Sequence, residues 1–191
     1  MNKTTSIMIV GVGGQGTLLA SKLIGAVAQK AGFDVKVSEV HGMSQRGGSV
    51  VTYVRYGKSV ASPIIERGEA DLILAFEALE AARYLPYLKK NGLLISNTRQ
   101  IDPMPVIIGA AQYPQDLLGK IEEQGVELVR CDALELARQA GNARAVNVAL
   151  IGLLAKRLSF ARADWEEAIR ATVPSKFYEQ NKKAFDLSYD A

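Results

Sequence analysis

Cysteine and histidine are nearly absent from this chain of 191 residues, which holds one of each, Cys131 and His41. A single cysteine excludes a disulfide within the chain. Iron–sulfur clusters normally take four thiolates, so this chain cannot build such a cluster alone. One cysteine and one histidine also argue against a zinc site. Any metal-based redox chemistry must therefore come from another chain.

Long apolar runs and blocks of one charge are also missing. No apolar run reaches the length that crosses a bilayer, and no five consecutive residues are basic. The net charge of +3 is spread over mixed pairs, which gives no case for nucleic acid. The start, MNKTTSIMIVGVGGQG, is basic and then apolar, but its short apolar stretch runs into glycines and indicates a strand, not a signal peptide. We expect a cytoplasmic protein that binds neither membrane nor nucleic acid.

The composition that remains fits one globular domain over residues 1–191. Apolar residues make up 48% and charged residues 23%, the range of ordinary folded chains. Strand-like and helix-like segments alternate, which predicts an α/β fold: a doubly wound, mostly parallel, Rossmann-like sheet with an added hairpin and a C-terminal helical segment. Strands are expected at 6–10, 35–40, 49–56, 71–76, 92–97 and 126–130. Helices are expected at 17–31, 77–90, 114–124, 133–140, 143–159, 164–170 and 175–187. The helix at 77–90 is expected to be interrupted or bent near Pro86.

Some segments carry finer predictions. The strand at 49–56 is expected to turn at Gly57-Lys58 and to pair with 59–65 as a hairpin. The run PVIIGA, 105–110, suggests a further short strand. Asp164 stands three residues before Glu167, which outlines a capping box at a helix start.

Three features concern the interior. Residues 146–154 are apolar nearly all round, so their helix is expected to be buried or pressed against a partner. Cys131 is interpreted as a small core residue. Trp165 is expected in the core or at an interface.

The stretch VGVGGQGT places Gly11, Gly13 and Gly16 at the G-x-G-x-x-G spacing between a strand and a helix. In such a turn the first glycine permits the tight bend, the second lets backbone N–H groups approach an anion, and the third lets helix and strand pack closely. A nucleotide site would also use an acid at the end of the second strand, where Glu39 stands. The alternative is a glycine turn that only packs the helix on the strand.

The loop EVHGMSQRGGSV follows a predicted strand, where open α/β sheets place ligand contacts. His41 stands at the strand end. Arg46 precedes two glycines, which suits a guanidinium that pairs with a carboxylate or phosphate. The alternative is a flexible loop whose arginine is solvated. We find no convincing nucleophile–base pair, no G-x-S-x-G elbow and no G-x-x-x-x-G-K-[ST] phosphate loop.

The segments GVGGQG and SEVHGMSQRGGSVVTYVRYG together resemble the gamma-type domain of the 2-oxoacid:ferredoxin oxidoreductases, and within that family the beta subunits of the indolepyruvate enzymes. The tail NKKAFDLSY is similar to the family's closing helix, with Ser188 where a glycine is expected more often. The likeness covers nearly the whole chain, and HGMSQRGG is far more specific than the glycine fingerprint. The matching residues are Gly11, Gly13, Gly14, Gln15 and Gly16, then His41, Gly42, Met43, Ser44, Gln45, Arg46, Gly47 and Gly48.

The resemblance implies a subunit that is inactive alone. The complete enzyme would oxidatively decarboxylate an arylpyruvate such as indolepyruvate, form an acyl-coenzyme A and pass electrons to ferredoxin. Thiamine diphosphate, Mg and iron–sulfur clusters would lie in a larger alpha subunit. The gamma-type domain would be associated with coenzyme A access and would cover the active site.

The resemblance also implies site residues, although it leaves open which of them touch substrate, coenzyme A or only the partner. The catalytic candidates are His41 and Arg46. The cofactor-binding candidates are Gly11, Gly13, Gly14, Gln15, Gly16, Ser44, Gln45, Arg46 and Gly47.

Two other functions compete with this one. A stand-alone NAD(P)-dependent dehydrogenase would bind the pyrophosphate at the glycine turn and the ribose at Glu39. A nucleotide-binding module without catalysis would use the same turn. The sequence itself favours a subunit, because it has neither the cysteines for electron transfer nor a G-D-G…N-N segment of the kind sought in a thiamine diphosphate site. The identity of the 2-oxoacid stays open.

Overall fold

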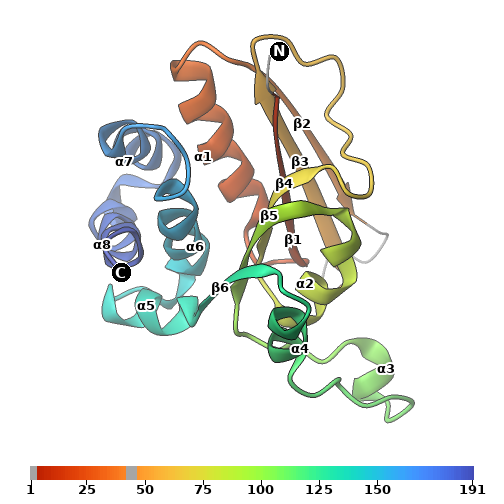
Figure 1. Cartoon of the computed structure of the whole chain (residues 1–191). Coiled ribbons are helices and arrows are strands. Elements are labelled where there is room, and N and C mark those ends of the chain that lie inside the picture. The colour runs from red at the N-terminus through yellow and green to blue at the C-terminus, as the bar shows by residue number, and fades with distance from the viewer. Residues whose placement is uncertain (1–3, 42–46) are drawn as a thin grey trace.

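The computed structural model describes residues 4–41 and 47–191, and it shows helices on both sides of one sheet (Figure 1). Six strands make up the sheet: β1 Thr5–Val12, β2 Asp34–His41, β3 Ser49–Gly57, β4 Ala70–Ala75, β5 Leu88–Asn97 and β6 Glu127–Cys131. The α-helices are α1 Thr17–Lys30, α2 Ala78–Tyr84, α3 Met104–Ile107, α4 Leu117–Glu123, α5 Ala133–Gln139, α6 Val146–Ala155, α7 Arg162–Thr172 and α8 Tyr178–Tyr189. Three 3-10 turns complete the fold: η1 Leu85–Tyr87, η2 Ala143–Ala145 and η3 Ser175–Phe177.

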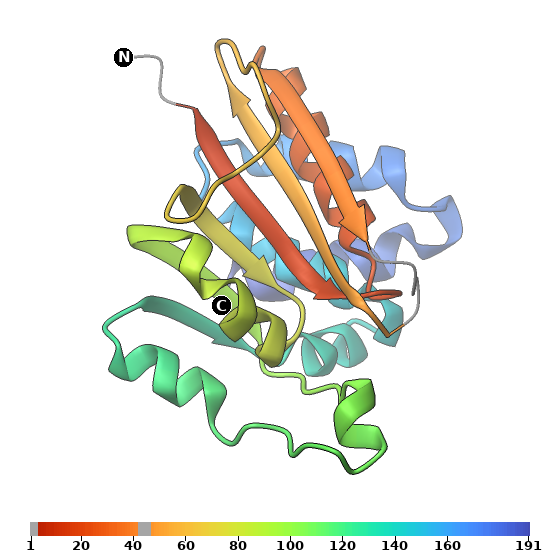
Figure 2. The same cartoon turned by 90° about the vertical axis from the view of Figure 1, so that its right-hand side faces the viewer.

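The strand order is β2-β3-β1-β4-β5-β6. Parallel ladders join β1 to β4, β4 to β5 and β5 to β6, whereas β3 is antiparallel to both β1 and β2. Five strands therefore run one way and only β3 runs the other, as Figure 2 shows. The predicted α/β fold with a mostly parallel sheet is confirmed. We call the edge where β1, β4, β5 and β6 end the carboxyl edge of the sheet.

The added hairpin is present, but its strands are β2 and β3. The predicted partner of β3, residues 59–65, forms no strand. Those residues lead instead onto the face of the sheet that carries α2 and α4, where Ile65 is buried with Met8 and Val10, and Arg55 Nη1 donates to the carbonyls of Ser62 and Ile64. Pro63 has no N–H to give to a ladder, while β2 already pairs with β3 along its whole length.

Alternate strand residues divide the core into two layers. On one face, residues such as Ile7 and Ile9 join a buried cluster with α1, α5, α6, α7 and α8. On the other face, Met8 and Val10 join a smaller cluster with α2 and α4. The doubly wound arrangement follows directly from this alternation. Within the described part of the chain, no helix has the length and apolar character needed to cross a membrane.

Helix α6 lies inside the larger cluster, and eight of its ten residues are buried. The all-round apolar sequence is therefore explained by this chain's own core, without a partner. The main neighbour of α6 is α8. Gly152 faces Ser188 there, and Ser188 Oγ donates to the carbonyls of Ala184 and Phe185. Ser188, at a position where the resemblance led us to expect glycine, is accommodated because residue 152 has no side chain.

The interruption expected near Pro86 is present, but the helix does not resume after it. Helix α2 stops at Tyr84, the turn η1 follows, and β5 begins at Leu88, so the predicted helix end at residue 90 is wrong. A predicted strand is wrong as well. Residues 105–110 are not a strand, because Met104–Ile107 is the short helix α3, with proline in its first turn.

The capping box is also wrong. Helix α7 starts at Arg162, so Asp164 already lies inside its first turn and caps nothing. The carboxylate of Asp164 instead forms an ion pair with Lys30 Nζ of α1 at 2.8 Å. Trp165, on the same helix, is completely buried, as expected of a core residue.

Gly152→Ala tests the contact between α6 and α8. A Cβ at this position would lie 1.9 Å from Ser188 Oγ and 2.5 Å from the carbonyl oxygen of Phe185. We expect a loss of about 3 kcal/mol in the free energy of unfolding, measured with urea. Gly25→Ala in α1 is the matched control, because its new Cβ would meet only Val35 Cγ1 at 3.8 Å. That control should gain about 0.5–1 kcal/mol, since alanine is the better helix former. Equal stability of the two variants would contradict this packing.

Cys131 is expected to be an unreactive thiol. Burial, with a smaller contribution from Asp132, raises its pKa to about 11. At pH 8 only about one thiol in a thousand would be ionised, so alkylation by iodoacetamide should be roughly 100-fold slower than for an exposed cysteine. The rate should rise about tenfold per pH unit up to pH 10. The urea-unfolded chain is the control and should react at the ordinary rate; equally fast reaction of the folded chain would refute the interpretation.

Candidate functional site

The two loops singled out in the sequence meet at the carboxyl edge of the sheet. β1 leads into the glycine turn and β3 follows the second loop, and these strands are neighbours with Val12 opposite Ser49. The N–H of Gly13 donates to the carbonyl of Gly48 at 2.9 Å. The backbone of His41 ends β2, but its side chain and residues 42–46 lie outside the described structure. The contacts of His41, Ser44, Gln45 and Arg46 therefore stay predictions.

Gln15 fixes the glycine turn to the sheet through its side-chain amide. Its Oε1 accepts from the N–H of Val12 at 2.7 Å, and its Nε2 donates to the carbonyl of Phe76 at 3.0 Å. Both ends of the amide are thus used to join β1 to the residue that follows β4. This gives Gln15 a structural role that the sequence did not indicate, and its predicted cofactor contact stays a prediction.

The structural roles of the glycines in residues 11–16 differ in part from the roles predicted from their spacing. Gly11 lies within β1, where a Cβ would come 2.8 Å from Gln15 Oε1 and 3.0 Å from Phe76 Cβ, so it permits close packing and not the bend. Gly14 and Gly16 make the bend, with φ of 97° and 87°. A Cβ on Gly16 would also meet Asn147 Nδ2 at 2.6 Å, so this glycine lets α1 approach α6, not a strand.

A cleft of about 610 Å³ opens between the glycine turn and the start of α6. Two arginines face into it, Arg99 from the end of β5 and Arg144 from the turn η2. Neither guanidinium has an acceptor elsewhere in residues 4–41 and 47–191, and none of the residues that line the cleft carries a carboxylate. The full lining is Val12, Gly13, Gly14, Gln15, Gly16, Gly47, Arg99, Ile101, Ala143, Arg144, Val146 and Asn147. We call this space the arginine cleft.

Backbone donors add to the positive character of the arginine cleft. The N–H groups of Gly14 and Gly16 have no backbone or side-chain acceptor in the described part of the chain. Helix α1 begins at Thr17 with no side-chain cap and no acidic residue in its first turn, so its N-terminus carries an uncompensated partial positive charge. Two guanidinium groups and backbone N–H groups, all without an acceptor among the described residues, are the chemistry that binds phosphate.

A second hollow, of about 400 Å³, lies on the other side of the glycine turn. Glu39 from β2 and Leu18 from α1 help to line it. The acid expected near a ribose is therefore close to the glycine turn. However, β3 lies between β1 and β2, so the spacing between Glu39 and the turn differs from that of a sheet in which these two strands are neighbours.

Two buried carboxylates stand behind the arginine cleft. Glu77 caps α2 by accepting from the N–H of Glu80 at 2.9 Å, and its other oxygen accepts from the N–H of Ile101 at 3.1 Å and from the hydroxyl of Tyr113. Glu80 accepts from Ser49 Oγ at 2.5 Å and from Arg83 Nε at 3.2 Å. Burial, followed by the contact with Glu77, raises the pKa of Tyr113. Every carboxylate oxygen is thus occupied, which indicates a structural network.

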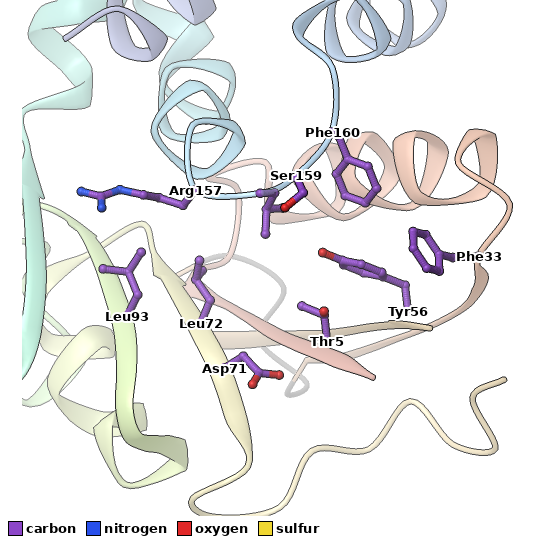
Figure 3. Close-up of a pocket in the computed structure, with 10 residues that line it drawn as sticks. Thr5, Phe33, Tyr56, Asp71, Leu72, Leu93, Arg157, Ser159 and Phe160 are labelled. Atoms are coloured by element: carbon purple, nitrogen blue, oxygen red, sulfur yellow. The ribbon is translucent and has the colours of Figure 1, made fainter. Parts of the chain in front are cut away.

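The opposite end of the sheet has a hollow of about 430 Å³ with a different character (Figure 3). The rings of Phe33, Tyr56 and Phe160 pack on one another there, with centroids 5.5–6.2 Å apart. Its polar groups do not converge: Asp71 pairs with Lys89 and the N–H of Ser6, and the guanidinium of Arg157 points away from the rings. The arginine cleft is therefore the better candidate site.

The described residues offer binding chemistry and no reaction centre of their own. No group of three or more His, Cys, Asp or Glu side chains in 4–41 and 47–191 is arranged to hold a metal ion. The half-buried Cys131 is not among the residues that line the arginine cleft. Arg99, Arg144 and Asn147 were missed from the sequence. Arg99 carries a usable signal, because it follows a buried strand that ends at the ligand-binding edge of the sheet.

Comparison with known proteins agrees with this picture of the fold. Residues 6–191 match the family described as pyruvate ferredoxin/flavodoxin oxidoreductase. Among the relatives is the indolepyruvate oxidoreductase subunit IorB of Thermococcus kodakarensis, which is 46% identical over 99% of this chain and 96% of its own length.

Solved structures share the architecture. The gamma subunit of a keto/oxoacid ferredoxin oxidoreductase from Geobacter sulfurreducens superposes with a TM-score of 0.72 at 22% identity, covering 97% of this chain and 96% of its own. The 2-oxoglutarate:ferredoxin oxidoreductase of Magnetococcus marinus gives 0.73 at 19% identity, covering all of this chain and 31% of that longer chain. A stand-alone NAD(P)-dependent dehydrogenase is not favoured by these relatives. The chain belongs to the pyruvate ferredoxin/flavodoxin oxidoreductase family and is a subunit of a 2-oxoacid:ferredoxin oxidoreductase.

Proposed function

We propose that this subunit holds the phosphate groups of coenzyme A in the arginine cleft, so that the thiol end reaches a reaction centre carried by a larger subunit. The observation behind the proposal is the pair Arg99 and Arg144, which line a cleft together with the glycine turn; in 4–41 and 47–191 neither the guanidinium groups nor the N–H groups of Gly14 and Gly16 have an acceptor. Coenzyme A carries a pyrophosphate and a 3′-phosphate. Its several anionic groups match a site with two arginines and a helix N-terminus.

The rest of the chemistry is assigned to the partner. With a single, half-buried cysteine and no metal-binding group among its described residues, this chain does not fit an iron–sulfur cluster. We therefore place thiamine diphosphate, its Mg and the iron–sulfur clusters in a larger alpha subunit, which would pass electrons to ferredoxin. Thiamine diphosphate supplies the carbanion stabilisation for decarboxylation when it is bound there. This subunit would orient the acyl acceptor and cover the active site.

The substrate we propose is an arylpyruvate, with indolepyruvate as the representative. The support is the relative at 46% identity, whose name includes indolepyruvate oxidoreductase. The compartment we propose is the cytoplasm, where ferredoxin-linked chemistry takes place. Gly47 lines the arginine cleft, and we propose that it and the three residues before it in the sequence, Ser44, Gln45 and Arg46, complete the contact with coenzyme A or substrate.

Replacing the cleft arginines tests the coenzyme A site. Arg144→Ala and Arg99→Ala should each weaken binding of coenzyme A to the assembled enzyme by about tenfold or more, because each removes a charge-assisted contact. Calorimetric titration measures the effect. Arg157→Ala, at the far end of the sheet, is the matched control and should bind normally. NADH is the competing probe. If NADH bound in place of coenzyme A, or if both cleft variants bound coenzyme A as the wild type does, the assignment would be wrong.

Arg46→Ala and His41→Asn test the second loop. We expect Arg46→Ala to lower the arylpyruvate-dependent reduction of ferredoxin by the assembled enzyme by about tenfold or more, because a planar anion-binding group is lost. Arg46→Lys should restore only part of the rate, since lysine cannot form the bidentate contact. His41→Asn shows whether the imidazole is needed. Full activity of Arg46→Ala would identify Arg46 as an ordinary surface residue.

A further inference from the structure

The connection from β5 to α4, residues 98–116, extends from the body of the protein as an arm that carries α3 (Figures 1 and 2). Its base is fixed at both ends. On the limb that leaves β5, the N–H of Ala78 donates to the carbonyl of Arg99, and the N–H of Ile101 donates to the carboxylate of Glu77. On the limb that leads to α4, the hydroxyl of Tyr113 donates to the same carboxylate. One buried side chain therefore holds the two limbs of the arm together.

The tip of the arm, residues 104–111, has the sequence MPVIIGAA, without a polar or charged side chain. Met104 is 65% exposed, Ile107 65% and Ile108 68%, the three most exposed large apolar residues in the described chain. The tip is ordered by its own backbone bonds, from Ile108 N to the carbonyl of Met104 and from Ala110 N to that of Pro105. A structured, contiguous apolar surface of this kind is characteristic of a binding surface.

The position of the arm indicates what covers it. Arg99 and Ile101, at the base, line the arginine cleft, and Ile101, Asp102 and Pro103 line a smaller hollow beside Glu77. The tip therefore projects from the same edge of the sheet to which a reaction centre must be brought. A second copy seated on the tip would stand over that edge and keep a larger subunit away from it.

We infer that the tip, residues 104–111, docks against the larger subunit that carries the reaction centre, and that Glu77 positions the arm for this contact. The inference rests on the proposed function, because that proposal supplies the partner. Docking beside the cleft would bury Met104, Ile107 and Ile108 and would bring the partner over Arg99 and Arg144. A rigid, preformed arm also lowers the ordering cost of association.

The test uses the larger subunit of the same enzyme, titrated with this chain. The double variant Ile107→Asp, Ile108→Asp should raise the Kd for the larger subunit by about tenfold or more, since charges placed in an apolar contact must be desolvated. Ile64→Asp is the matched control: residue 64 is 48% exposed but lies in the connection between β3 and β4, so its Kd should be unchanged. Unfolding midpoints of both variants should equal that of the wild type.

Three outcomes would overturn the inference, and they are distinguishable. If the wild-type chain bound the larger subunit and the double variant bound equally well, the tip would not be the docking surface, while the proposed function would stand. If the wild-type chain did not bind the larger subunit at all, the proposed function would fail together with the inference. If light scattering showed a homodimer that the double variant abolished, with the larger subunit still bound, the occupant would be a second copy.

Discussion

The side-chain amide of Gln15 is the contact on which the geometry of the carboxyl edge depends. It joins the end of β1 to the residue after β4, two parallel strands whose ends would otherwise be linked only by their ladder. With the turn held in this way, Gly14 and Gly16 can present bare N–H groups toward the arginine cleft. Gly11 belongs to the same arrangement, because only a residue without a side chain leaves room for the Gln15 amide.

The chain separates binding from reaction. The apolar helix α6 is buried in the core of this chain, so it offers no hydrophobic surface to a partner. Any hydrophobic contact with a partner must be made by other residues. Among the described residues, the charged groups that line the arginine cleft are Arg99 and Arg144, while the nearby carboxylates of Glu77 and Glu80 accept hydrogen bonds within the chain. A lining of this kind suits the binding of an anion. Such a division suits a subunit whose reaction centre arrives with another chain.

The sequence predicted those parts of the fold that depend on local patterns. Alternating apolar runs located all six strands, and Gly32 correctly marked the end of α1, since it adopts φ of 82° just after the helix. The wrong predictions concern segments whose structure depends on contacts with residues far away in the sequence. Residues 105–110 are apolar enough for a strand, but Met104–Ile107 forms the short helix α3, and the segment pairs with neither edge strand of the sheet, β2 or β6. Asp164 has the spacing of a capping residue, but its carboxylate forms an ion pair with Lys30, which is far away in the sequence.

The candidate site, too, was predictable where it depends on local sequence patterns and not where it depends on contacts between distant residues. The spacing of glycines in 11–16 and the composition of the second loop identified two segments that do come together, through Gly13 and Gly48. Arg99 and Arg144 escaped notice because each is an ordinary exposed arginine in its own segment. Only the topology, which brings the end of β5 and the turn before α6 to the glycine turn, gives them a common target.

Glu77 shows how one buried residue can serve two surfaces at once. Its carboxylate caps α2 and holds both limbs of the arm by accepting from three donors, the N–H groups of Glu80 and Ile101 and the hydroxyl of Tyr113. These neutral donors stabilise the buried carboxylate without cancelling its charge, and Glu77 is not among the residues that line the arginine cleft. A carboxylate that lined the cleft would weaken anion binding by Arg99 and Arg144. The network around Glu77 therefore keeps this carboxylate out of the cleft and the arm in place by the same hydrogen bonds.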